Sequence, residues 1–337
     1  MKYRYSVPGK LYIAGEYAVV KGFHAILTPT KLMLHVDIES HDSYVIESNQ
    51  WERPKMYDPN SLKDNELWEK ALKISYQYLS HKHIEFKSSS ITIISDLDKL
   101  DHKFGLGSSG AVVIGIIKAI LSFHKIKVTP LLLYKLGVLS QKEDVEVASF
   151  GDLACSAFDT PIVYKKDMSL DMNRPFSELI ESTWSQLVIQ EVSESFDVMV
   201  IHTNESASSS KLVQLLNDNM DDKTQKDVLI TIDRHVLSFL NAIRSKNKTT
   251  AYKHIKALES LSKTLDDSMN GMMYSKNIQC IFAFAQSHEL VYKISGAGGG
   301  DNVILFLDSQ EAYNEIKQRL PKPFLNITNY IKGVTYE

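Results

Sequence analysis

The chain has 337 residues, 44% of them hydrophobic, which is enough apolar material for a large core and two domains. Its 38 basic and 41 acidic residues give a net charge of −3, so no overall basic field draws it to nucleic acid or to an anionic membrane. Two lone thiols, Cys155 and Cys280, exclude a disulfide scaffold and cannot close a four-ligand zinc site.

The first part of the chain is rich in strand signals. Strands are predicted for the β-branched and aromatic runs at residues 4–7, 10–14, 31–40, 43–48 and 88–97. Residues 31–40 alternate apolar and polar side chains, which indicates a strand with one buried face. Helical periodicity predicts helices at 62–79, directly after Gly110, and at 131–141.

Membrane and export signals are absent from the sequence pattern. The N-terminal residues contain no apolar stretch of the kind found in signal peptides. The longest apolar run, residues 111–123, is interrupted by Lys118 and is too short to span a bilayer. We therefore expect a cytoplasmic protein without a membrane or nucleic-acid partner, and we infer no obligate protein partner.

The pattern changes near residue 180. Residues 186–192 and 196–203 are predicted to form paired strands, and amphipathic helices follow from Lys211 to about Ser287. A glycine run separates two further strand-like pieces, and residues 311–320 are predicted to be helical. Strands and helices that cluster without strict alternation favour an α+β, two-layer architecture. We place the domains at residues 1–180 and 181–337.

The central segment Gly105-Leu-Gly-Ser-Ser-Gly110 has G-x-G-x-x-G spacing. A dinucleotide-binding fold requires a strand leading into the first glycine and an acidic residue about 20 positions later, and neither is present. A Walker A loop requires a lysine after its last glycine, which is also missing. Small residues at the start of a helix still suit anion binding, although Ser108 and Ser109 are equally explained as helix caps.

Two other segments combine glycine with polar side chains. Residues 8–17 place Lys10 between two turns, where a lysine alone is usually just a solvated charge. Residues 294–301 contain four glycines in five positions, more than a hairpin needs, which favours a loop that approaches a ligand closely.

Taken together and in this order, the three segments resemble the GHMP kinases. The matching motifs are Pro8-Gly9-Lys10 with Gly15-Glu16-Tyr17, Gly105–Gly110, and Lys293-Ile-Ser-Gly-Ala-Gly-Gly-Gly-Asp301. The resemblance implies a two-domain GHMP kinase fold, with an N-terminal domain like domain 2 of ribosomal protein S5 and a ferredoxin-like C-terminal domain. It also implies ATP and Mg²⁺ as cofactors and an active site between the domains.

The resemblance carries specific roles onto this chain. The implied catalytic residues are Lys10, Lys103 and Asp152, the last within Ser149-Phe-Gly-Asp152. The implied ATP-phosphate contacts are Gly105, Leu106, Gly107, Ser108, Ser109 and Gly110, with Ser109 also a Mg²⁺ ligand. The second metal ligand is left open, because neither Glu143 nor Glu146 aligns with the glutamate of the family. The implied acceptor site consists of Lys10, Tyr17, Ser149, Asp152, Ser209, Ser210, Gly296, Ala297, Gly298 and Gly299.

Within the family the segments look most like bacterial phosphomevalonate kinases, which implies a small phosphorylated acceptor. Lys103 supports this assignment, because such kinases carry a lysine at that position. Ile201-His202-Thr203 departs from the Gly-Trp-Thr usual in them, which weakens it. Mevalonate or homoserine kinase activity, and a non-catalytic ATP or sugar sensor on the same fold, are the alternatives. Asp152 would either deprotonate or only position the acceptor oxygen.

Overall fold

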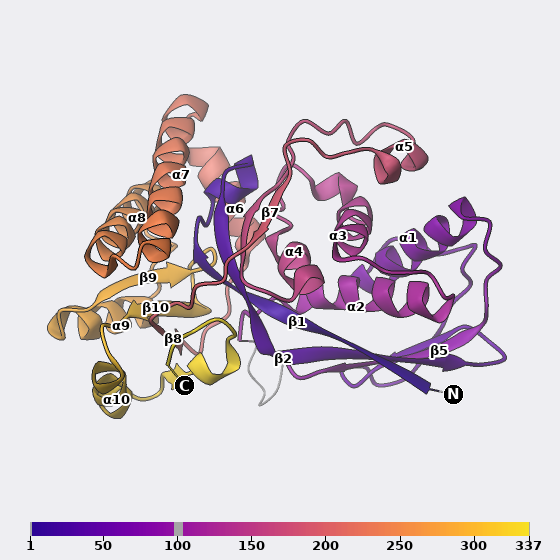
Figure 1. Ribbon diagram of the computed structural model, residues 1–337, viewed down its shortest axis with the longest axis horizontal. Coiled ribbons are helices and arrows are strands. Elements are labelled where there is room, and N and C mark those ends of the chain that lie inside the picture. The colour runs from indigo at the N-terminus through magenta and orange to yellow at the C-terminus, as the bar shows by residue number, and fades with distance from the viewer. Residues whose placement is uncertain (1, 98–103, 337) are drawn as a thin grey trace.

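The structure, a computed structural model, describes residues 2–97 and 104–336, so the predicted site residue Lys103 lies outside the described residues. Within these ranges the strands form two sheets, each covered by helices (Figure 1). None of the helices in these ranges is both long enough and apolar enough to cross a bilayer.

The first sheet is organised by two long antiparallel strands. Its strands are β1 (Lys2–Ala14), β2 (Ala25–Ser40), β3 (Val45–Ser48), β4 (Lys55–Met56), β5 (Ser89–Ser95), β6 (Ile162–Lys165) and β7 (Val188–Glu191). The two strands expected at 4–7 and 10–14 are one strand, β1, with a bulge between Pro8 and Lys10. A proline cannot donate to a strand ladder, and a bulge accommodates it there. Lys10 directly follows this bulge.

The apolar face of this sheet is packed against helices. Helices α2 (Ser108–Phe123) and α4 (Gly151–Phe158) contact its strands. Helices α1 (Leu67–His81) and α3 (Pro130–Leu139) pack against these two, and α5 (Phe176–Glu181) contacts α3. In β2 the predicted alternation is confirmed, since Leu34, Val36 and Ile38 are fully buried. Asp37, on the polar face, is buried as well because Arg4 and Lys2 pair with it.

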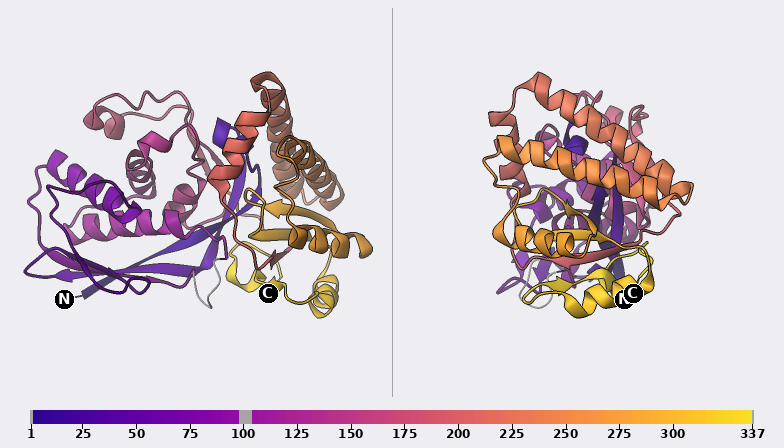
Figure 2. Two further views of the ribbon diagram at one scale, coloured as in Figure 1. Left: turned by 180° about the vertical axis from the view of Figure 1, so that it is seen from behind. Right: turned by 90° about the vertical axis from the view of Figure 1, so that its left-hand side faces the viewer.

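The second sheet has the strand order β11-β8-β10-β9. Its strands are β8 (Val198–His202), β9 (Val291–Ser295), β10 (Asn302–Phe306) and β11 (Leu325–Asn326). The accompanying helices are α6 (Ser209–Asn219), α7 (Asp222–Arg244), α8 (Lys248–Ser268), α9 (Lys276–Ser287) and α10 (Gln310–Arg319). The long helices α7 and α8 lie side by side at one end of the molecule (Figure 2).

The expected pairing of residues 186–192 with 196–203 is wrong. β7 pairs with β6 at the edge of the first sheet, and β8 pairs with β10 and β11 in the second. The two strands also differ in burial: two of the four residues of β7 are exposed, whereas all five residues of β8 are buried. The domain boundary placed between residues 180 and 181 stays a prediction, and β7 beyond it still belongs to the first sheet.

Candidate active site

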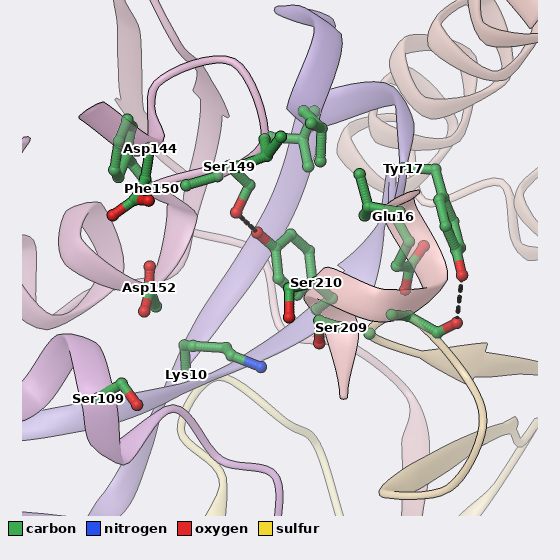
Figure 3. Close-up of a pocket in the computed structure, with 18 of the residues that line it drawn as sticks. Lys10, Glu16, Tyr17, Ser109, Asp144, Ser149, Phe150, Asp152, Ser209 and Ser210 are labelled. Atoms are coloured by element: carbon green, nitrogen blue, oxygen red, sulfur yellow. Dashed lines mark hydrogen bonds between the residues drawn. The ribbon is translucent and has the colours of Figure 1, made fainter. Parts of the chain in front are cut away.

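A pocket of about 490 Å³ is lined by residues of both domains. Figure 3 shows Lys10 of β1, Ser109 of α2 and Asp152 of α4 converging on it, with Ser209 and Ser210 of α6 nearby. The predicted site residues that line this pocket are Lys10, Tyr17, Ser109, Ser149, Asp152, Ser209, Ser210, Gly296 and Ala297. Three segments that are distant in sequence therefore meet in one cavity.

Lys10 is anchored to the central glycine segment through both its backbone and its side chain. Its N–H donates to the carbonyl of Leu106 at 2.7 Å, and its Nζ donates to the carbonyl of Gly105 at 3.1 Å. Gly107 lies against the lysine stem with φ +81°, and a Cβ there would stand 2.7 Å from Lys10 Cγ. Only glycine allows this approach. Leu106 itself is buried, so its contribution here is its carbonyl.

The N-terminus of α2 opens beside Lys10. Gly107 is the N-cap residue, so Ser108 and Ser109 lie inside the first turn rather than at the capping position. The interpretation of the two serines as helix caps therefore loses its basis. N–H groups of a first turn lack intrahelical acceptors, and together with the helix dipole they favour an anion. The Ser109 side chain lies at this end of the pocket.

Asp152 lies in the first turn of α4, next to the first turn of α2. A Cβ on Gly110 would stand 2.7 Å from Asp152 Oδ2, so this glycine also makes room for a site residue. Burial raises the pKa of the Asp152 carboxyl, whereas the Lys10 ammonium and the N–H groups of Leu153, Asp152 and Gly110 lower it. The carboxyl is thus held where two helix N-termini and one lysine oppose the cost of burying its charge.

Ser149 is held by tyrosine hydroxyls. Its Oγ lies 2.8 Å from the hydroxyl of Tyr12, and its carbonyl accepts from Tyr164 at 2.8 Å. Burial raises the pKa of Tyr12, so its phenol stays protonated near neutral pH. Tyr12 is not among the site residues predicted from the sequence. It stands two residues after Lys10, and side chains two apart on a strand share a face.

The late glycine loop is fastened to the first segment by three contacts between the domains. The Tyr17 hydroxyl donates to the Ala297 carbonyl at 2.6 Å, and the Ser295 hydroxyl donates to the Tyr12 carbonyl at 2.7 Å. The Lys293 ammonium pairs with Glu16 at 2.5 Å; the Lys293 side chain is buried, and the Glu16 side chain is 9% exposed at the pocket. The loop entrance is therefore held against β1 before any ligand binds.

Gly298 and Gly299 are not among the described residues that line the pocket. Gly299 donates its N–H to the Met273 carbonyl at 2.6 Å, and a Cβ on Gly298 would stand 2.4 Å from Met273 Cγ. The acceptor-binding role expected of these two glycines stays a prediction.

Glu16, Lys293 and Asp301 lie within the GHMP kinase motifs of this chain, but the motifs alone predicted no role for them. A Cβ on Gly105 would stand 2.3 Å from Asp301 Cγ, which places this aspartate behind the central segment. Burial raises the pKa of Asp301, and Lys10 opposes the rise. The sequence signal that could have identified these three residues as part of the site is their position inside the motifs.

Oxygen ligands for a divalent cation are present at the pocket. Ser109, Asp144 and Asp152 line it and offer a hydroxyl and two carboxylates. The Oδ2 atom of Asp144 lies 3.6 Å from Lys70 Nζ. Across residues 2–97 and 104–336, His, Cys, Asp and Glu side chains do not gather in groups of three with metal-binding geometry. This sparse set of oxygen ligands fits Mg²⁺, which typically takes one or two carboxylates and completes its shell with water and substrate phosphates.

The chain is similar to several known proteins. Residues 65–160 match the family model described as the GHMP kinases N terminal domain. A phosphomevalonate kinase from Streptomyces sp. strain CL190 is 26% identical, with 97% of each chain covered. A mevalonate kinase from Methanocaldococcus jannaschii is 25% identical over 96% of this chain and 97% of that protein. The structure of Streptococcus pneumoniae phosphomevalonate kinase in complex with phosphomevalonate and AMPPNP is 25% identical, with a TM-score of 0.82 over 96% of this chain and all of that one.

Proposed function

This chain belongs to the GHMP kinase family, and we propose that it transfers the γ-phosphoryl group of ATP to 5-phosphomevalonate, giving 5-diphosphomevalonate and ADP in the mevalonate route to isoprenoids. The two-domain GHMP kinase fold implied by the three glycine-bearing segments is confirmed. The observation that carries the proposal is the presence of Lys10, Ser109 and Asp152 in one pocket that both domains line.

On the nucleotide side, the first turn of α2 supplies N–H groups and the positive end of a helix dipole to the ATP phosphates. Lys10 adds a cation next to the same turn, where it stabilises charge on the group being transferred. Mg²⁺ would be held by Ser109 together with the phosphates, and when bound it neutralises phosphate charge.

On the acceptor side, Asp152 faces the same space from α4 and positions the acceptor oxygen. A phosphate monoester has a second pKa of about 6, so near neutral pH most of the acceptor is already ionised and needs no base. For this acceptor, Asp152 therefore acts in positioning rather than in proton removal. Ser209 and Ser210 of the second domain supply hydroxyl donors at the pocket.

One observation favours a second candidate, phosphorylation of the alcohol mevalonate. Of the described residues that line the pocket, Lys10 is the one with a permanently cationic side chain, whereas a phosphorylated acceptor adds about two negative charges. The cation expected to balance them, Lys103, lies outside the described residues. The similar mevalonate kinase from Methanocaldococcus jannaschii agrees with this alternative.

A coupled assay of ADP release separates the candidates. The purified chain is offered mevalonate, phosphomevalonate, homoserine and galactose with Mg²⁺ and ATP, and we expect turnover with phosphomevalonate. Lys103→Met should then reduce turnover of phosphomevalonate far more than any residual turnover of mevalonate. Turnover of mevalonate alone would replace the proposal with the second candidate. ATP binding without turnover of any acceptor would instead identify a sensor.

A further inference from the structure

The strand β6 and the residue after it lie beneath the segment that leads into Asp152. Tyr164 and Lys166 stand two positions apart, so they project to the same side of this extended stretch, and both are almost fully buried. The Tyr164 hydroxyl donates to the carbonyl of Ser149 at 2.8 Å. The Lys166 ammonium donates to the carbonyls of Val145 at 2.6 Å and Ala148 at 2.8 Å. Two side chains of one strand end thus hold three carbonyls of the segment.

The strand β6, which supplies these contacts, is itself held firmly in the fold. β6 pairs with β2 on one side and with β7 on the other. The Tyr164 hydroxyl also lies 2.9 Å from the hydroxyl of Tyr134 on α3, which connects it to the helical layer. Movement of the two donors is therefore restricted by strand pairing and by a second buried phenol.

The segment requires such support because it has little regular structure of its own. Residues 145–149 lie between a short 3-10 turn and α4, and Val147 is exposed to solvent. Phe150, at the N-cap of α4, has φ +57°, a left-handed conformation that is strained for a bulky residue. Such strain persists only where the surroundings over-determine the backbone. The Phe150 ring is buried, and the Lys166 ammonium lies 5.9 Å from its centre.

We propose that Tyr164 and Lys166 are positioning residues, which clamp residues 145–150 to the end of β6 and thereby hold Asp152 in register with Lys10 and Ser109. The inference rests on the proposed phosphoryl transfer for its effect on rate. Tyr164 and Lys166 are not among the described residues that line the pocket. Both therefore act through residues 145–150 and not directly on a substrate.

The cost of burying Lys166 argues against a packing role alone. Burial lowers the pKa of this amine to about 8, with Lys21 acting in the same direction and Glu146 against it. An apolar side chain of similar length would fill the space without that cost. What it would lack is the pair of N–H donors, and without them the carbonyls of Val145 and Ala148 would lose those partners.

The test compares Lys166→Met with Lys165→Met, the same substitution one residue earlier, at a lysine on the opposite side of the strand. We expect Lys166→Met to speed hydrogen exchange at the amides of residues 147–151 by about tenfold or more, because local opening becomes easier. We expect kcat per folded molecule to fall by about 10- to 100-fold, the scale of a misplaced catalytic group, with KM for ATP nearly unchanged. Lys165→Met should change neither quantity.

Several results would overturn the clamp. Unchanged exchange at 147–151 in Lys166→Met refutes it whether or not the chain is a kinase, because this measurement needs no turnover. Faster exchange with an unchanged kcat refutes the link to Asp152. If the chain phosphorylates no acceptor, the exchange result still decides the clamp while the proposed function fails. Should Lys166→Met not fold, Tyr164→Phe, which removes a single hydroxyl, replaces it and must raise exchange at 149–151.

Discussion

Glu259 provides the sharpest quantitative prediction, because its protonation is coupled to stability near neutral pH. This α8 carboxyl is buried; its Oε1 accepts from the Tyr274 hydroxyl at 2.5 Å, and its Oε2 has no hydrogen-bond partner among the described residues. Burial raises the pKa of Glu259 from 4.5 to about 7, although the Tyr274 hydroxyl, the Lys293 ammonium and the Ile294 N–H lower it. The native state therefore binds more protons than the unfolded chain between pH 4.5 and about 7.

Ionisation of Glu259 lowers the stability of the folded chain as the pH rises. The free energy of unfolding contributed by Glu259 is highest below pH 4.5 and is lost as the pH rises to about 7. At about 1.4 kcal/mol per pH unit, the rise from 4.5 to about 7 corresponds to a loss of about 3 kcal/mol. This loss already includes the attraction of Lys293, so it is the net cost of ionising the buried carboxyl.

Glu259→Gln should remove that loss, because glutamine is a neutral side chain of nearly the same shape. We expect the variant to match the parent chain near pH 4.5 and to exceed it by up to about 3 kcal/mol at pH 8. Urea unfolding from pH 4.5 to 8 measures the difference, and Glu289→Gln, at an exposed glutamate, is the control that should leave the curve unchanged. A stability difference that stays constant with pH would refute the reasoning.

Two further predictions concern the site itself. Asp152→Asn should lower kcat by about 10²- to 10⁴-fold, the usual contribution of such a group. It should also raise the melting temperature at pH 7, because burial disfavours the charge that is removed. Activity and thermal unfolding measured on the same sample check both effects, and a lower melting temperature would contradict the expected sign. Lys293→Met should cost about 3–5 kcal/mol in urea unfolding, because it leaves the largely desolvated Glu16 carboxylate without its ion-pair partner. The double change with Glu16→Gln should recover most of this loss, and additive losses would show that the pair is not coupled.

Elements whose signal is local could be predicted from the sequence. The helix after Gly110, the one-sided strand at 31–40 and the glycine loop before β10 are all present near the expected positions. The partners of β7 and β8 could not be predicted, because strand pairing depends on contacts between distant segments. Short apolar runs next to each other in sequence look like a hairpin whether or not they pair.

The side-chain contacts between the domains were likewise beyond the sequence pattern. Glu16 and Lys293 are separated by 277 positions, and one acidic and one basic residue at that distance carry no spacing signal. Within the first domain, the same holds for Tyr12 and Ser149, which are 137 positions apart. The motif resemblance brought the segments together, but the pairs that fasten them became visible only in three dimensions.

The glycines of the central segment show why a motif can be recognised before its reason is understood. From sequence, G-x-G-x-x-G suggests a backbone that approaches a phosphate closely. In the structure, a Cβ at Gly107 or Gly110 would collide with Lys10 or with Asp152, at 2.7 Å in each case. The same two glycines that leave the start of α2 open to an anion therefore also admit the lysine and the carboxylate that would act on it. Gly107→Ala and Gly110→Ala would each disturb both functions at once, which is why spacing alone cannot separate them.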